Sequence, residues 1–174
     1  MKRLSTLLFA LLSLAACVAF AQTMGSGTRE TPADSPDAMF VQQAGMSGSA
    51  ELELSRLAIR QAQSADVRKF AEDMVREHER NNRELETIAA HENIAPPKTI
   101  DDEHAQLRAQ LSVMHGSDFD RAYMDAMRSD HEKLAVLLRS SQATVSTPEL
   151  RRYITSTLPV VQDHLQMAES VHLE

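Results

Sequence analysis

Five ionisable side chains occupy positions at which a helical pattern predicts buried residues. When about 100° of rotation is assigned to each residue, an acidic or histidine side chain falls in the middle or at the edge of every long apolar face. These residues are Glu51, His78, Asp130, His131 and His164. Because burying an ion without a partner costs several kcal/mol, the five groups must contact one another, reach water or bind a metal ion.

Two interpretations of these residues remain open. Imidazoles combined with carboxylates are a ligand set for a transition metal such as Fe, Mn, Zn or Cu. The same groups can also form a hydrogen-bonded network that fixes the register of the helices without a metal. The network is our first hypothesis, because no spacing between the five residues is diagnostic of a metal site. It describes a non-enzymatic protein, whereas the alternative is a metal-binding or redox protein.

No other part of the sequence points to a particular reaction. We find no nucleophile elbow, phosphate-binding loop or dinucleotide fingerprint. Four further histidines lie near expected helix ends or in a connecting segment, where we expect them to contact solvent. They are His91, His104, His115 and His172.

Helical periodicity extends over the chain from residue 36 onward. It predicts long helices over 36–63, 65–91, 117–144 and 148–172, and a short helix over 100–114. Each start is marked by a residue that can accept hydrogen bonds from the first free amides. The expected caps are Ser35, Ser64, Thr99, Ser117 and Thr147.

The long helices are expected to pack into an all-α, ferritin-like four-helix bundle. Each has one apolar face that it cannot bury alone. The second helix follows the first almost without a loop, which makes the two antiparallel neighbours. The link over 92–116 contains the short helix and is long enough to cross the bundle, as a ferritin-like topology requires.

Composition excludes several classes of protein. A length of 174 residues favours a single domain. One cysteine excludes an internal disulfide framework and a cysteine-based zinc or iron–sulfur site within this chain. The formal charge of −7 provides no basic surface for nucleic acid or an anionic membrane. We therefore expect no nucleic-acid partner.

The N-terminus is predicted to be an export signal. Lys2 and Arg3 precede an apolar run, and Ala19-Phe20-Ala21 has the small-x-small pattern of a cleavage site, so residues 1–21 resemble a signal peptide. A second interpretation is that Leu14-Ala15-Ala16-Cys17 is a lipobox with a lipid anchor at Cys17. Cleavage predicts a periplasmic protein, and lipidation predicts a lipoprotein anchored to the outer membrane.

The remaining chain divides into a tether and one domain. Residues 22–35 are dominated by polar residues, glycine and proline, and we expect a disordered tether there. Residues 36–174 would form the bundle domain. No later stretch approaches the about 20 apolar residues of a membrane-spanning helix. The mature chain is therefore expected to have no transmembrane span.

Acidic residues directly precede a histidine on three of the expected helices, as Glu77-His78, Asp130-His131 and Asp163-His164. Further recognisable segments flank them: Phe40-Val41, Glu51-Leu52-Glu53-Leu54, Met74-Val75-Arg76-Glu77-His78, Phe119-Asp120-Arg121-Ala122-Tyr123-Met124 and Leu158-Pro159-Val160-Val161-Gln162-Asp163-His164-Leu165. Over about residues 38–170 the chain resembles a secreted, ferritin-like bacterial family of unknown function whose members are often labelled predicted outer membrane proteins.

The resemblance implies a ferritin-like four-helix bundle with no established activity. Ferritin-type di-iron sites use Glu-x-x-His on two helices. Three residues before His78, His131 and His164 the sequence has Val75, Arg128 and Val161 instead. A ferroxidase-type di-iron centre is therefore not expected, and any metal site would be mononuclear or vestigial.

Overall fold

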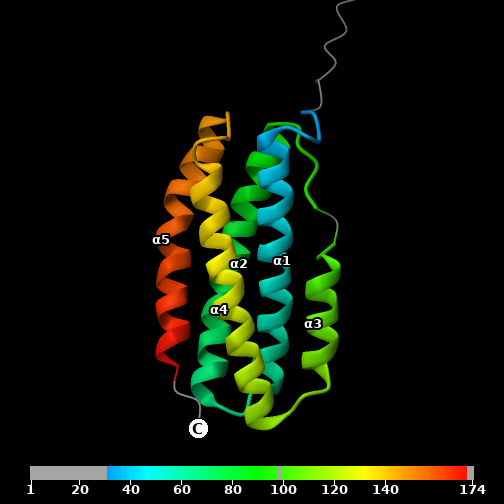
Figure 1. Ribbon diagram of the computed structural model, residues 1–174, viewed down its shortest axis with the longest axis vertical. Helices are drawn as coiled ribbons and strands as arrows, with labels where there is room; N and C mark the ends of the chain where they lie inside the picture. Colours follow the sequence, from blue (N-terminus) through cyan, green and yellow to red (C-terminus); the bar gives the residue numbers. More distant parts are fainter. Residues whose placement is uncertain (1–30, 98, 172–174) are drawn as a thin grey trace, which may run out of the picture.

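The computed structural model describes residues 31–97 and 99–171 (Figure 1). These residues form α1 (Pro36–Gln61), α2 (Ala65–His91), α3 (Asp102–Ser112), α4 (Gly116–Ser141) and α5 (Pro148–Ser170). The predicted all-α bundle, with one short helix between the second and third long helices, is confirmed. The predicted signal peptide, Cys17, most of the predicted tether and His172 lie outside the described residues.

The four long helices are arranged as a square. In Figure 1, α1 and α5 run downward, whereas α2 and α4 run upward. Helix α1 packs against α2 and α4, and α5 packs against the same two helices. The chain returns from the top of α2 to the bottom of α4 through α3, which lies on the outside against α1 and α4. This return is the crossover that the long link predicts.

The helix starts confirm two of the expected caps. The hydroxyl of Ser35 accepts a hydrogen bond from the amide of Ala38, and Pro36 occupies the first turn. The hydroxyl of Ser64 accepts from the amides of Asp66 and Val67 at the start of α2. Because only three residues separate α1 from α2, this cap fixes where the hairpin turns.

Three starts differ from the expectation. Asp101, not Thr99, caps α3 through the amide of His104, since a carboxylate is a stronger acceptor than a hydroxyl. Helix α4 begins at Gly116, so Ser117 already lies inside the first turn and is not the cap. Thr147 is at the N-cap of α5, as expected, but makes no side-chain cap bond; its hydroxyl instead donates to the buried carboxylate of Asp37 on α1.

Two hydrophobic clusters fill the bundle, one in each half of its length. The cluster nearer the start of α1 includes Phe40, Leu138 and Ile154. The other includes Leu54, Met127 and further residues from all four long helices. The polar positions singled out in the sequence fall between these clusters along every long helix. A polar layer therefore crosses the middle of the core.

Candidate metal site

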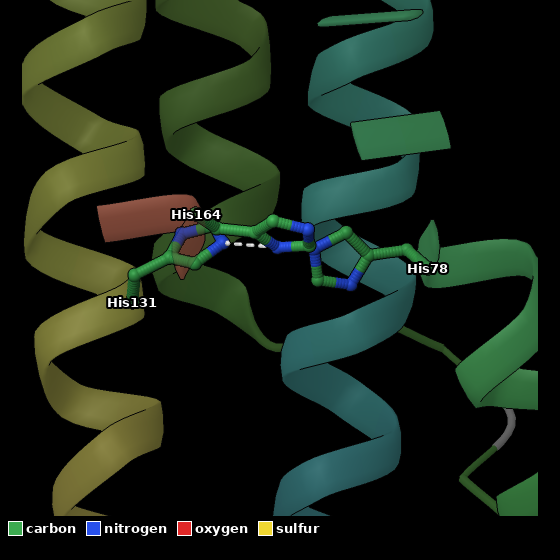
Figure 2. Close-up of side chains that lie close together, drawn as sticks. All are labelled: His78, His131 and His164. Atoms are coloured by element: carbon green, nitrogen blue, oxygen red, sulfur yellow. Dashed lines mark hydrogen bonds between the residues drawn. The ribbon is translucent and has the colours of Figure 1, made fainter. Parts of the chain in front are cut away.

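The polar layer receives one side chain from each long helix. Glu51 comes from α1, His78 from α2, His131 from α4 and His164 from α5. None is more than 4% exposed. Figure 2 shows the three imidazoles directed toward one another from different helices. We call these four residues the interior centre.

The three imidazoles lie close enough to bind one ion. One ring nitrogen from each of His78, His131 and His164 lies within 4.8 Å of those of the other two. Nε2 of His131 is 3.3 Å from Nδ1 of His164, which is the hydrogen bond drawn in Figure 2. The positions of His78, His131 and His164 were singled out from helical phase alone, and the structure brings their rings together.

The main chain fixes the orientation of His131. Its Nδ1 lies 2.8 Å from the carbonyl oxygen of Met127, one turn earlier in α4. A carbonyl only accepts, so Nδ1 is the donor in this bond. In the neutral ring Nε2 is then an acceptor, and its lone pair faces the centre, where Nδ1 of His164 lies 3.3 Å away. A histidine ligand held through its second nitrogen is the usual arrangement at metal sites.

The carboxylate of Glu51 completes the interior centre. Its Oε2 is 2.7 Å from Nε2 of His78 and 3.8 Å from Nε2 of His131. Its Oε1 accepts a hydrogen bond from the hydroxyl of Ser47 at 3.2 Å. Although Oε2 of Glu51 and Nε2 of His78 are close, their alignment does not form a hydrogen bond, and both atoms are buried. A carboxylate oxygen and a ring nitrogen are thus buried next to each other without a hydrogen bond between them.

Burial and charge act in opposite directions on Glu51. Burial alone would raise the pKa of its carboxyl group, but the nearby imidazoles of His131 and His78 and the hydrogen bond from Ser47 outweigh it and lower the pKa to about 2. For His164, burial and then the charges of His131 and His78 lower the pKa to about 3. At neutral pH the centre therefore contains an ionised carboxylate and a neutral imidazole, the forms that bind metals.

A glycine lets α1 and α2 approach each other beside this centre. Gly48 lies one turn before Glu51, and a Cβ atom there would be 2.2 Å from Oδ1 of Asn82, one turn after His78. No side chain fits in that space unless Asn82 moves. Gly48 therefore helps to bring Glu51 and His78 within contact distance.

The structure places Asp130 in a different group. Its Oδ2 is 3.4 Å from Nε2 of His104 on α3, and its Oδ1 is 3.6 Å from Nζ of Lys133. The carboxylate is 5% exposed. Of the five residues singled out in the sequence, four form the interior centre, and Asp130 contacts α3.

The expectation that His104 contacts solvent was wrong. Its residue exposure is 9%, and its Nδ1 is 2.6 Å from Oδ2 of Asp101. Asp130 raises the pKa of the His104 imidazole most; burial opposes this, Asp101 adds to it, and the pKa reaches about 9. His91 and His115 are exposed as expected, and His172 lies outside the described residues.

The fold and the centre together define a class: an all-α four-helix bundle with a crossover helix and one buried polar side chain of the interior centre on each long helix. Within that class, the chain belongs to the DUF4142 family, a domain of unknown function that matches residues 19–171. The resemblance to a family of unknown function is confirmed at this level. No curated protein matches the sequence.

Three solved structures share this fold. A DUF305 fragment from Deinococcus radiodurans has a TM-score of 0.70 at 20% identity, over 80% of this chain and 95% of its own. A DUF305 protein from Streptomyces coelicolor, described as a predicted secreted protein, has a TM-score of 0.68 at 14% identity, over 79% and 90%. CopM in a Cu(II)-bound form has a TM-score of 0.65 at 15% identity, over 76% and 93%. At these identities the likeness establishes the fold alone.

The membrane prediction is confirmed for the described part of the chain. No helix within residues 31–97 and 99–171 is both long enough and apolar enough to span a bilayer.

Proposed function

We propose that this protein is an exported metal-binding bundle that holds one transition-metal ion at the interior centre. The observation that supports this most directly is the convergence of four buried donor groups from four helices. Glu51, His78, His131 and His164 have little or no contact with water. Such groups need strong mutual bonds or an ion, and one close pair among them forms no hydrogen bond.

The spacing of the donor atoms suits a four-coordinate ion. With metal–nitrogen bonds of about 2.0–2.1 Å, two ligands of a tetrahedral zinc site lie about 3.3–3.4 Å apart. The ring nitrogens of His131 and His164 are separated by 3.3 Å. Small side-chain movements would bring His78 and Glu51 to the same spacing, because both already lie in the layer.

The ligand types narrow the choice of metal. Imidazole binds Zn, Cu and Fe well, whereas Mn prefers carboxylate and water ligands. Three imidazoles and one carboxylate therefore favour Zn, Cu or Fe over Mn. The structural likeness to CopM, whose description includes bound Cu(II), makes Cu(II) a metal to test first beside Zn(II).

The proposed role is binding rather than catalysis. A catalytic zinc site keeps one coordination position for water or substrate, whereas a closed site uses four protein ligands. The interior centre supplies four donor groups, and each is buried. Storage, buffering or stabilisation by the metal fits this arrangement. Cleavage after Ala21 would place the protein in the periplasm, and lipidation at Cys17 would attach it to the outer membrane.

The second candidate is a metal-free network that fixes the helix register. It is favoured by the two hydrogen bonds of His131, one to the carbonyl of Met127 and one to His164. The two functions differ in what an added metal does. A network gains nothing from an added metal ion, whereas a binding site is stabilised by it.

The decisive measurement is the unfolding temperature of the purified, untagged protein with and without added Zn, Cu, Fe or Mn. A metal present at 100 times its dissociation constant should stabilise the fold by about 2.7 kcal/mol. His78→Ala should abolish the increase because it removes one ligand. His91→Ala is the matched control, since that histidine is exposed and should leave the increase unchanged.

Two outcomes contradict the proposal. One is an unfolding temperature that no metal raises while metal analysis finds less than stoichiometric content. The other is an increase that persists in His78→Ala and is lost in His91→Ala, which would place the binding on the surface. Either result favours the metal-free network.

A further inference from the structure

A second acid–histidine pair faces a cavity beside the interior centre. The cavity has a volume of about 260 Å³ and lies between α1, α3 and α4. Its polar and sulfur-containing lining includes Met46, Ser47, Asp101, His104, Asp130 and Lys133. We call His104 and Asp130 the cavity pair.

In the cavity pair, as in the interior centre, a buried acid and a buried histidine lie close together without a hydrogen bond between them. Nε2 of His104 and Oδ2 of Asp130 are buried and 3.4 Å apart, but they form no aligned hydrogen bond. Among the described residues, the other buried side-chain atoms in this state are Oε2 of Glu51 and Nε2 of His78. Both cases are an acid and a histidine held close together without a bond between them.

The far side of His104 is fixed in the way that metal ligands usually are. Its Nδ1 lies 2.6 Å from Oδ2 of Asp101, and its main-chain amide donates to the other oxygen of the same carboxylate. A carboxylate on the second ring nitrogen orients a histidine toward a metal and makes it a better ligand. Here that orientation turns Nε2 toward Asp130.

The cavity and the interior centre share a wall. Ser47 lines the cavity, and its hydroxyl donates to Oε1 of Glu51. Asp130 of the cavity pair is the residue directly before His131 of the interior centre. Ser47 therefore contacts both the cavity and the carboxylate of the interior centre.

From this arrangement we infer that the cavity is the loading site of the interior centre. His104 and Asp130 take a divalent transition-metal ion from solvent, and the ion then passes Ser47 to reach Glu51 and the three histidines. The inference rests on the proposed function, because a loading site needs a centre to load. Two protein ligands completed by water bind weakly and exchange quickly, whereas the buried ligands retain the ion.

The carboxylates of Asp101 and Asp130 can attract a cation to the cavity, and they lie on opposite sides of the His104 ring. Two positive groups oppose them. The pKa of His104 is raised to about 9, so a bound ion has to displace the proton on Nε2. Lys133 is 3.6 Å from Asp130, but its side chain is 57% exposed and also pairs with Glu103. Lys133 can therefore swing outward when a divalent ion arrives. A purely structural clasp, in which His104 only ties α3 to α4, is the competing explanation.

The test follows Co²⁺ binding by stopped-flow absorbance and by equilibrium titration. Asp130→Asn and His104→Gln remove the two cavity ligands with little change of shape. Each should slow association with the interior centre by about 10-fold or more, because the cavity no longer concentrates the ion. The equilibrium affinity of the centre should stay within a factor of about 3, since its four ligands are intact. Asp125→Asn is the control, since it removes the same charge from an exposed site on the same helix.

The possible results separate the two proposals. Association at the wild-type rate in both variants, with normal equilibrium binding, overturns the loading site and leaves the metal centre intact. A lower unfolding temperature with an unchanged rate identifies the cavity pair as a structural clasp and also overturns the loading site. Absence of the tetrahedral Co²⁺ spectrum already in the wild type overturns the proposed function, and the loading site with it.

A further arm tests the cavity by itself. In His78→Ala, the interior centre is disabled but the cavity keeps its lining. This variant should still bind one Co²⁺ weakly, and adding Asp130→Asn should abolish that binding. Equal binding with and without Asp130→Asn would overturn the loading site whatever the behaviour of the centre.

Discussion

The interior centre and the cavity pair use the same two kinds of residue in opposite proportions. In the interior, one carboxylate faces three imidazoles, and the pKa of Glu51 falls to about 2 while that of His164 falls to about 3. At the cavity, one imidazole lies between Asp101 and Asp130, and the pKa of His104 rises to about 9. The number of acids and histidines in each group, together with burial, therefore determines which side chains are charged.

The difference between the two groups suits them to different tasks: the interior centre would retain a metal ion, and the cavity pair would capture one from solvent. The carboxylate of Glu51 and the neutral imidazole of His164 can bind a metal without first releasing protons, and all four donor groups of the interior centre are buried. At the cavity, the carboxylates of Asp101 and Asp130 can attract a cation from solvent, and an ion that binds His104 must displace the proton that the raised pKa keeps on the ring. The following predictions test whether the two groups differ in this way, from the largest expected effect to the smallest.

The largest difference should appear when each acid is removed from the metal-free protein. Glu51→Ala should lower the free energy of unfolding by about 3 to 5 kcal/mol, because it leaves buried imidazoles without their counter-charge. Asp130→Ala should lower it by about 1 to 3 kcal/mol, because His104 keeps Asp101 as a partner. Urea unfolding monitored by circular dichroism measures both. An equal or larger loss in Asp130→Ala would contradict the distinction.

The interior centre should also make the protein sensitive to acid. His164 has a folded-state pKa of about 3, against 6.5 for an unperturbed histidine. Between these values the unfolded chain binds more protons than the folded one, so stability falls as the pH drops from 6.5 toward 3. Glu51 adds to the loss as the pH falls from 4.5 toward 2. We expect a loss of a few kcal/mol across this range in urea unfolding, and a smaller loss in His164→Leu.

The cavity pair should show the opposite dependence on pH. The pKa of His104 is raised from 6.5 to about 9. Its contribution is therefore fully present below pH 6.5 and is lost as the pH rises toward 9. This loss of stability at high pH should be smaller than the loss at low pH, because the His104 ring is partly screened by water. His104→Gln should remove the alkaline loss and leave the acid loss unchanged, and the reverse outcome would exchange the roles of the two groups.

The smallest effect is expected when the interior acid and one imidazole are replaced together. In the absence of metal, the double variant Glu51→Gln with His78→Leu should be within about 1 kcal/mol of the wild type or more stable, since it removes a buried charge and its partner at once. Thermal unfolding without and with Zn²⁺ checks this. Severe destabilisation in metal-free buffer would show that packing cannot replace the polar contacts.

Helical phase was sufficient to find most of the interior centre. Glu51, His78 and His164 each lie on the face that a rotation of about 100° per residue turns inward. The same reasoning left the choice between Asp130 and His131 open, because the two lie on opposite edges of the apolar face of α4. At an edge, phase leaves two directions open, and only the neighbouring helix decides between them.

The second half of the site depends on the crossover, which sequence patterns describe poorly. His104 lies on a helix of 11 residues with a weakly apolar face, so nothing in its spacing indicates which long helix it packs against. The spacing of Asp101 and His104 was a usable local signal, because an N-cap acid can also hold a histidine three residues later. Its partner Asp130 comes from a different helix and required the fold.

The interior centre takes one ligand from each of four helices, and this has a consequence for how slowly a bound ion would leave. Displacing any one long helix would break one metal–ligand bond, so release toward the cavity would wait for a fluctuation of the helices that supply the ligands. A chelator in solution would then act at a rate set by the protein's own fluctuations and independent of chelator concentration. The lifetime of the bound ion would then report the rate at which the helices of the bundle move apart.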